Sequence, residues 1–174
     1  MIDYDLTKIK ALVFDVDGVL SSSVMNLSDS GDPVRTVNVK DGYAMQLAVK
    51  KGLKLCIITG AKVQSLRKRY GGLGIPDEDI YIASSVKIGD YHDFMERHGL
   101  KPEEVLYMGD DIPDYQVMQE CGLPCCPADA VPEIQALSRY VSPFNGGCGC
   151  VRDVVEHVMK VNGMWLSDNH AFGW

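Results

Sequence analysis

The sequence has no long apolar run and no excess of positive charge. No uninterrupted apolar stretch approaches the roughly 18 residues of a membrane helix, and residues 1–5 are acidic rather than the basic and then apolar start of an export signal. The formal net charge is -7, with 17 basic and 24 acidic residues, whereas nucleic acids are bound by clustered Lys and Arg. We therefore expect a cytoplasmic protein that binds neither membrane nor nucleic acid.

The cysteines lack the spacing of a common zinc site. Cys125 and Cys126 are adjacent, and Cys148 and Cys150 are separated by one residue, so neither pair has the C-x2-C pattern. Without an export signal, thiols are expected to stay reduced. We interpret the cysteines as free thiols, with Cys56 in the core because it lies in an apolar run.

The 174 residues suffice for one domain with a substantial core. Strand-like apolar runs alternate with helical patterns, several of which end at glycine. This alternation predicts an α/β fold, a doubly wound parallel sheet with helices on both faces. The expected strands are Ala11–Phe14, Leu53–Ile58, Ile80–Ile82, Val105–Met108 and Pro124–Cys126, and the expected helices are Asp41–Lys51, Ala61–Tyr70, Lys87–His98, Pro113–Cys121, Val131–Leu137 and Cys150–Val161.

Two segments depart from this alternation. Within residues 21–39, the apolar stretches Val24–Leu27 and Val34–Val39 flank a polar turn that contains glycine and proline, which predicts a projecting β-hairpin. Residues 1–163 are expected to form the single domain. The tail, residues 164–174, contains both tryptophans, so we expect it to dock on the domain or on a neighbouring subunit rather than to be disordered.

Polar residues follow the predicted strands. Asp15-Val16-Asp17-Gly18 follows the first strand, Thr59-Gly60 the second and Gly109 to Asp114 the fourth, while Lys87 lies shortly after the third. In an open parallel sheet, ligands bind outside the carboxyl ends of the strands. We therefore expect these residues to converge in one active site for phosphoryl transfer.

The spacing of the first two aspartates suits covalent catalysis. Residues two apart on a strand point the same way, so Asp15 and Asp17 can face one pocket. One carboxylate can attack phosphorus to form an aspartyl-phosphate, while its neighbour protonates the leaving oxygen and later activates water. Asp15 and Asp17 suit these two roles in that order.

An anionic nucleophile and an anionic ester require a cation between them. Mg²⁺ is expected because it prefers hard oxygen ligands, which Asp110, Asp111 and Asp114 supply. Lys87 would neutralise phosphoryl oxygens, and Thr59 with nearby backbone N–H groups would hydrogen-bond them. Alone, Lys87 is as well explained as a solvated lysine and Thr59 as a helix N-cap, so the prediction depends on their combination with the aspartates.

These four motifs resemble those of the haloacid dehalogenase superfamily. The resemblance implies that Asp15 is the nucleophile, that Asp17 is the acid/base and a metal ligand through its carbonyl, and that Asp110 binds magnesium with support from Asp111 and Asp114. An aspartate at position 17 disfavours the dehalogenase branch. Only 44 positions separate Asp15 from Thr59, and 28 separate Thr59 from Lys87, so no cap domain is expected. A neighbouring subunit is expected to cover the site, with the hairpin and the tail as lids.

Within this superfamily, the chain is similar to the 3-deoxy-D-manno-octulosonate 8-phosphate phosphatase family. The features that carry this likeness are the hairpin, the segment from Asn38 to Gly42 and the glycine-rich segment Gly146–Asp153. The resemblance implies a magnesium-dependent homotetramer that hydrolyses a phosphorylated sugar acid in lipopolysaccharide synthesis. The substrate-binding residues that it implies, together with the catalytic set, are Asp17, Asn38, Val39, Lys40, Asp41, Gly42, Thr59, Gly60, Arg69 and Lys87.

The chain departs from the family pattern at two positions. Ala61 and Gln46 stand where the family often has arginine, which leaves the sugar acid open. A nine-carbon acid, N-acylneuraminate 9-phosphate or its deaminated form, is the main competitor. Lys40, Lys62 or the Arg152 side chain of a neighbouring subunit would compensate for the missing charges. Asp41 is equally well explained as an N-cap, since a helical pattern begins directly after it.

Two functions from other classes also fit parts of the pattern. A signalling receiver domain has a similar sheet and acidic pocket, but it carries its acceptor aspartate on the third strand rather than the first. A non-catalytic assembly domain would not need the intact set of Asp15, Asp17, Lys87 and Asp110. The order of the motifs therefore favours the phosphatase.

Overall fold

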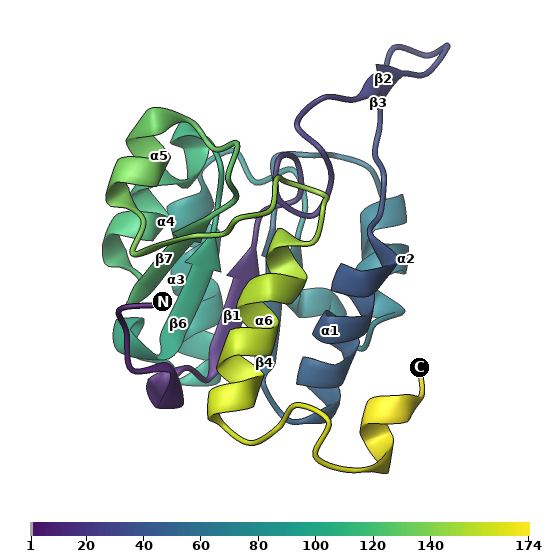
Figure 1. Cartoon of the computed structure of the whole chain (residues 1–174). Coiled ribbons are helices and arrows are strands. Elements are labelled where there is room, and N and C mark those ends of the chain that lie inside the picture. The colour runs from purple at the N-terminus through teal and green to yellow at the C-terminus, as the bar shows by residue number, and fades with distance from the viewer. Residues whose placement is uncertain (1) are drawn as a thin grey trace.

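Parallel strands form the centre of the computed structural model, which describes residues 2–174. They form a six-stranded sheet in the order β5-β4-β1-β6-β7-β8, of which Figure 1 labels the inner strands β4, β1, β6 and β7. The strands are β1 Ala11–Phe14, β4 Lys54–Ile58, β5 Ile80–Tyr81, β6 Val105–Met108, β7 Leu123–Cys126 and β8 Tyr140–Val141. Every residue of β1, β6 and β7 is buried, as expected for strands covered on both faces.

Helices cover both faces of this sheet, as predicted. On one face, α1 (Val39–Lys50), α2 (Ser65–Gly71) and α6 (Cys150–Val161) pack against one set of strand side chains that includes Leu12 and Phe14. On the other, α3 (Lys87–His98), α4 (Tyr115–Glu120) and α5 (Pro132–Leu137) pack against the alternate set that includes Ala11 and Val13 (Figure 1). Short 3₁₀ helices occur at Leu6–Lys8 (η1), Asp77–Asp79 (η2), Pro102–Glu104 (η3), Ile112–Asp114 (η4) and Asn169–Phe172 (η5).

The predicted helix Ala61–Tyr70 begins later than its sequence pattern indicates. Helix α2 starts at Ser65, because the preceding loop is bonded elsewhere. The Ala61 amide donates to Thr59 Oγ1 (3.2 Å), and the Ala61 carbonyl accepts from the amide of Ala83 (2.8 Å). The loop after β4 is thereby tied to the loop after β5. Strand β8, of two residues, was not predicted.

The hairpin consists of β2 (Asn26–Leu27) and β3 (Pro33–Val34), which pair antiparallel and project from the body of the molecule (Figure 1). The predicted second strand, Val34–Val39, is wrong beyond Val34, because residues 35–38 form no strand and α1 begins at Val39. The Asn38 side chain accepts hydrogen bonds from the amides of Lys40 (2.9 Å) and Asp41 (3.4 Å) and so caps α1. Asn38, rather than Asp41, is therefore the N-cap.

The tail, residues 164–174, lies along α1 of its own chain. Lys51 forms an ion pair with Asp168, and the Tyr43 ring meets Trp165 and Trp174 edge-on, with centroids 6.5 Å and 5.7 Å apart. Aromatic pairs in this arrangement are stabilising. None of the helices within residues 2–174 combines the length and apolar character needed to cross a membrane.

The loops after β1 and β6 approach so closely that only glycine fits between them. Gly18 has a φ of +86°, and a Cβ placed there would lie 1.9 Å from Asp110 Oδ2. This φ disfavours any L side chain, and the contact forbids one. Gly18 therefore sets the separation between the first and the last of the predicted acidic motifs.

Gly18→Ala is expected to destabilise the protein more than Gly52→Ala. Both positions have positive φ, +86° and +90°, but a Cβ at Gly52 would meet no atom within 4 Å. Both variants should therefore lose about 1 kcal/mol through backbone strain, and only Gly18→Ala should lose more by displacing Asp110. Urea unfolding measures both values. Equal losses would mean that the approach of the two loops contributes nothing to stability.

Candidate active site

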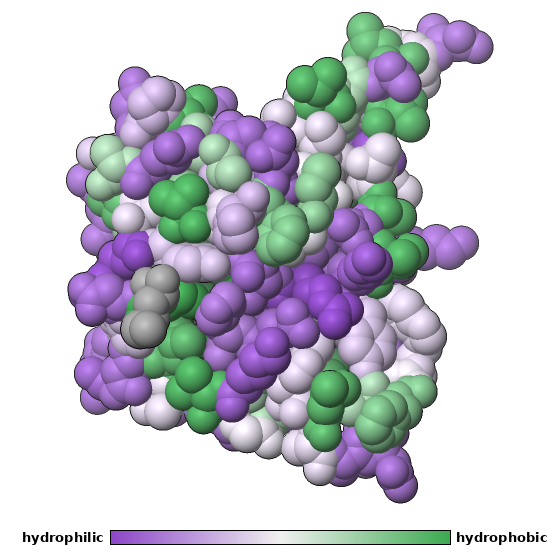
Figure 2. Space-filling model, in the orientation of Figure 1, coloured by the Kyte–Doolittle hydropathy of each residue, from purple (hydrophilic) through white to green (hydrophobic). Residues whose placement is uncertain are grey.

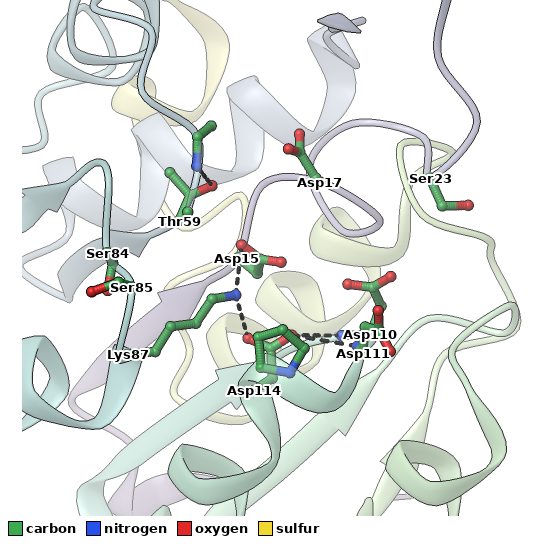
Figure 3. A pocket seen from close by; sticks show the side chains of 13 residues that line it. Asp15, Asp17, Ser23, Thr59, Ser84, Ser85, Lys87, Asp110, Asp111 and Asp114 are labelled. Carbon is green, nitrogen blue, oxygen red and sulfur yellow. Dashed lines mark hydrogen bonds and ion pairs between the residues drawn. The ribbon is translucent and has the colours of Figure 1, made fainter.

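A cavity of about 410 Å³ opens at the carboxyl ends of the central strands. Figure 3 shows that its walls come from the four segments that follow the strands. It is lined by Asp15, Asp17, Ser23, Thr59, Gly60, Ala61, Ser84, Ser85, Lys87, Asp110, Asp111, Pro113 and Asp114. The structure thus brings together all the residues assigned to catalysis and metal binding from the sequence.

Asp15 and Lys87 form a buried ion pair at the base of this cavity. Lys87 Nζ lies 2.9 Å from Asp15 Oδ1, and both side chains are less than a tenth exposed. Burial, followed by the charge of Asp114, raises the pKa of Asp15 to about 8, although Lys87 opposes this shift. One lysine does not fully offset the desolvation of these carboxylates. A further cation would favour the ionised form of Asp15 that can attack phosphorus.

Asp114 holds the site together through both of its carboxylate oxygens. Its Oδ1 accepts hydrogen bonds from Lys87 Nζ (2.7 Å) and the Tyr107 hydroxyl (2.6 Å). Its Oδ2 accepts from the backbone amides of Asp110 (3.1 Å) and Asp111 (3.4 Å). Because each oxygen already accepts two bonds, Asp114 acts here mainly by positioning Lys87 and the Asp110–Asp111 loop.

The donor set fits a hard divalent cation such as Mg²⁺. Carboxylate oxygens of Asp15, Asp110 and Asp114 lie within 4.8 Å of one another. Asp110 Oδ1 is buried without a hydrogen-bond partner, and burial, followed by the charge of Asp114, raises the pKa of Asp110 to about 7. An unpartnered buried carboxylate oxygen is costly, and a cation bound to it would remove that cost. Asp111 also lines the cavity, with one oxygen bonded to the Ile112 amide (2.8 Å).

The loops after β4 and β5 form the wall opposite the aspartates. Thr59 is buried, and its carbonyl accepts from the Ser84 amide (3.0 Å). Ala83, which directly precedes Ser84 in the loop after β5, has a φ of +59°, a strained conformation for a residue with a side chain. Ser84 and Ser85 also line the cavity, and Val86 separates them from Lys87. Sequence reasoning missed these serines, although two hydroxyl residues before the predicted lysine were a usable signal.

Asp17 lies at the rim of the cavity, where its carboxylate binds the guanidinium of Arg35. Arg35 Nε donates to Asp17 Oδ1 and its terminal nitrogen donates to Oδ2, both at 2.6 Å. Sequence reasoning missed Arg35 because it lay within the expected hairpin strand. No local pattern indicated that the hairpin would turn this side chain back toward the sheet.

The segment from Asn38 to Gly42 and Arg69 do not line the 410 Å³ cavity. Except for the exposed Val39 and Lys40, they line a second, very small concavity beside it. Asp41 Oδ1 accepts from the Arg152 amide (2.7 Å), and burial raises the pKa of Asp41 to about 6. A Cβ at Gly42 would lie 2.4 Å from the Arg69 guanidinium. In this structure Asp41 joins the starts of α1 and α6, and Arg69 of α2 lies against Gly42. The contact of this segment and of Arg69 with substrate stays a prediction.

Known proteins share both the sequence and the fold. No family model matches the chain. The 3-deoxy-D-manno-octulosonate 8-phosphate phosphatase of Escherichia coli K12 is 36% identical over 155 residues, which cover 89% of this chain and 81% of that protein. The chain belongs to the 3-deoxy-D-manno-octulosonate 8-phosphate phosphatase family. The relative from Yersinia pestis is 34% identical over 151 residues, covering 87% of this chain and 80% of its own.

Solved structures of this family have the same architecture. The crystal structure of the Yersinia pestis phosphatase matches with a TM-score of 0.86 and 33% identity, covering 91% of this chain and 85% of that one. A Moraxella catarrhalis phosphatase, in complex with magnesium, phosphate and the sugar acid, matches with a TM-score of 0.85 and 29% identity, covering 91% of both chains. The predicted family and the capless haloacid dehalogenase fold are confirmed, and the receiver-domain alternative is wrong.

Magnesium is expected to stabilise this member of the family more strongly at pH 8 than at pH 5.5. The pKa values of Asp15 (about 8) and Asp110 (about 7) lie above the ordinary value of about 4. Between about pH 4 and 8 these two carboxyl groups therefore bind more protons in the folded state without cation than in the unfolded state, so their contribution to stability falls as the pH rises. Bound Mg²⁺ would counter this loss, because it favours the ionised carboxylates.

Thermal unfolding in EDTA and in MgCl₂ at the two pH values measures this effect. Asp110→Asn should shrink the increase in Tm caused by Mg²⁺ at pH 8, because it removes the buried unpartnered carboxylate. Asp29→Asn, in the exposed hairpin turn, is the matched control and should leave the increase unchanged. A magnesium-induced shift of the same size at both pH values would contradict the ionisation argument.

Proposed function

We propose that this protein is a magnesium-dependent phosphatase that hydrolyses 3-deoxy-D-manno-octulosonate 8-phosphate to the free sugar acid and phosphate. The observation that carries this proposal is the buried cluster of Asp15, Lys87 and Asp114 beside the unpartnered oxygen of Asp110. The relatives named for this reaction match over more than four fifths of this chain, and one relative's structure holds magnesium, phosphate and the sugar acid.

The reaction would proceed in two displacements at phosphorus. A carboxylate oxygen of Asp15 forms a bond to phosphorus as the ester oxygen leaves, and Asp17 gives that oxygen its proton. Asp17 then takes a proton from water, which attacks the aspartyl-phosphate and releases phosphate. When bound, Mg²⁺ supplies positive charge between the nucleophile and the phosphoryl oxygens. Asp15 and Asp110 would hold it with the carbonyl of Asp17, as the family resemblance implies.

Lys87 and the loop after β4 would bind the phosphoryl group. Lys87 is fixed by both Asp15 and Asp114, so its ammonium group is positioned before substrate arrives. Thr59 and the residues directly after it line the opposite wall and offer hydroxyl and amide donors. Donors that are already oriented cost little reorganisation when charge develops in the transition state. This arrangement supports the phosphate-binding roles assigned to Thr59, Gly60 and Lys87.

Phosphate release from a panel of substrates tests the proposed reaction. The eight-carbon 8-phosphate should have the highest kcat/KM, about tenfold or more above N-acetylneuraminate 9-phosphate and its deaminated analogue. Ala61 lines the cavity where an arginine is common, so the nine-carbon acids are the competitors to include. A higher kcat/KM for either nine-carbon acid would identify that compound, rather than the eight-carbon acid, as the preferred substrate. If no compound released phosphate, the proposal that the protein is a phosphatase would be contradicted.

Asp15→Asn in the same assay tests the assigned chemistry. Its kcat should fall by about 10⁴-fold or more, because the amide is not a nucleophile. EDTA should also stop turnover, and added Mg²⁺ should restore it. Asp29→Asn is again the control. Retained turnover by a folded Asp15→Asn variant would exclude the aspartyl-phosphate at this position.

We also propose that the protein is a homotetramer in which the hairpins meet. Val24 is 86% exposed and Leu27 is 70% exposed, and Figure 2 shows apolar surface on the projecting hairpin. Exposed apolar patches of this kind mark association surfaces. Light scattering should give a tetramer for the wild type and a smaller species for a Val24→Ser/Leu27→Ser variant. A monomeric wild type would contradict this assembly.

The cytoplasm is the compartment that we propose for this protein. All six cysteines are free thiols in the structure, and five of them are buried. Unpaired thiols in this number suit a reducing compartment.

A further inference from the structure

The contact between Arg35 and Asp17 places the proposed acid/base in an arrangement that differs from the one needed for proton transfer. Both carboxylate oxygens of Asp17 accept hydrogen bonds from the guanidinium, each at 2.6 Å. This fork-to-fork geometry is the strongest that arginine forms with a carboxylate. To protonate a leaving oxygen, one Asp17 oxygen must carry a proton and face the ester. At least one of the two bonds to Arg35 must therefore open during turnover.

Arg35 belongs to a segment that lies outside the central sheet, since β2 and β3 pair only with each other. It follows β3 in the projecting hairpin, both of whose short strands are exposed. Beside the Arg35–Asp17 pair, the hairpin stem is held by the amide of Thr36, which donates to Ser21 Oγ (3.1 Å). An arginine side chain has several rotatable bonds. The Arg35 side chain is 12% exposed and that of Asp17 is 35% exposed, so an exchange of partners requires movement of the hairpin stem at the cavity rim rather than of β1 or the core.

The cavity itself has few positive charges for a substrate with two anionic groups. Among its lining residues within 2–174, five are aspartates and Lys87 is the one cation. Lys87 is committed to Asp15 and Asp114, beside the place where the phosphoryl group must lie. The sugar acid also carries a carboxylate. Ala61 and Gln46 supply no charge for it, whereas Arg35 is a guanidinium already in contact with the rim of the cavity.

We propose that Arg35 is an exchangeable latch that holds the Asp17 carboxylate in the free protein and passes to the carboxylate of the bound sugar acid. The exchange replaces one carboxylate partner of the guanidinium by another, so Arg35 keeps a charged partner, while Asp17 takes up from water the proton that it later gives to the leaving oxygen. It frees Asp17 to face the ester oxygen when a substrate with the correct anionic group is present. The proposal rests on the proposed function, and it adds a residue that selects sugar acids over other phosphate esters.

Arg35→Gln, measured on two kinds of substrate, tests the latch. For the phosphorylated sugar acid, KM should rise about 10- to 100-fold, because the variant loses charged hydrogen bonds to the carboxylate. For p-nitrophenyl phosphate, which has no carboxylate, KM should stay within about twofold and kcat should rise, because Asp17 is no longer held. Arg35→Lys keeps the positive charge but loses the two parallel N–H donors of the guanidinium, so its KM for the sugar acid should lie between those of the wild type and Arg35→Gln.

Arg67→Gln is the matched control, since Arg67 pairs with Asp77 (3.0 Å) and does not line the cavity. It should leave both substrates unaffected. Titration calorimetry with the free, unphosphorylated sugar acid provides a readout without turnover, and Arg35→Gln should weaken this binding by a factor similar to its rise in KM. Thermal unfolding checks that the variants fold.

The alternatives give different results. An equal rise in KM for both substrates would mean that Arg35 binds the phosphoryl group, and an equal fall in kcat would mean that it only positions Asp17. If neither KM nor kcat changed with either substrate, Arg35 would have no role in binding or catalysis. Each of these outcomes overturns the latch. If the wild type releases phosphate from neither compound, the proposed function fails, whereas the calorimetric comparison still decides whether Arg35 binds the sugar acid.

Discussion

The burial of several carboxylates around one lysine is the constraint on which the site depends. Asp15 and Asp114 both contact Lys87, at 2.9 and 2.7 Å, so the ends of β1, β6 and α3 are held together by a single ammonium group. Burial of these acids without full compensation raises the pKa values of Asp15 and Asp110. The same burial leaves Asp110 Oδ1 without a hydrogen-bond partner, and a divalent cation bound to that oxygen would offset the cost of its burial.

Glycines allow this concentration of charge at the ends of the central strands. A Cβ at Gly109 would lie 2.4 Å from the Asp114 side chain, and one at Gly146 would lie 2.0 Å from the carbonyl of Gly18. The segment before α6 therefore packs directly against the backbone of the loop after β1. Since no cap covers the cavity, the projecting element beside the site is the hairpin, which reaches Asp17 at the cavity rim through Arg35. The tail packs on α1 instead.

Much of the fold could be predicted because its elements have clear periodicity and clear ends. Strands β1 and β6 and helices α3 and α6 begin and end where the sequence indicates. The acidic motifs could be predicted for a related reason: polar residues directly after buried strands have few other roles. The start of α2 could not, because backbone bonds between the loops after β4 and β5 delay it. Tyr107 was missed because a tyrosine within a buried strand resembles ordinary core, although its hydroxyl bonds to Asp114.

The amino acid sequence by itself determined the sheet, the order of its motifs and the set of aspartates with Lys87, since these follow from local patterns and from the rule that parallel strands present their ends at one edge. Only the tertiary structure decided which contacts each of these residues makes. The oxygens of Asp114 accept hydrogen bonds from Lys87, Tyr107 and two backbone amides. Asp17 pairs with Arg35 of the hairpin, and Asp41 joins α1 to α6. These roles depend on which atoms approach across distant segments, and such contacts leave no periodic signal in the chain.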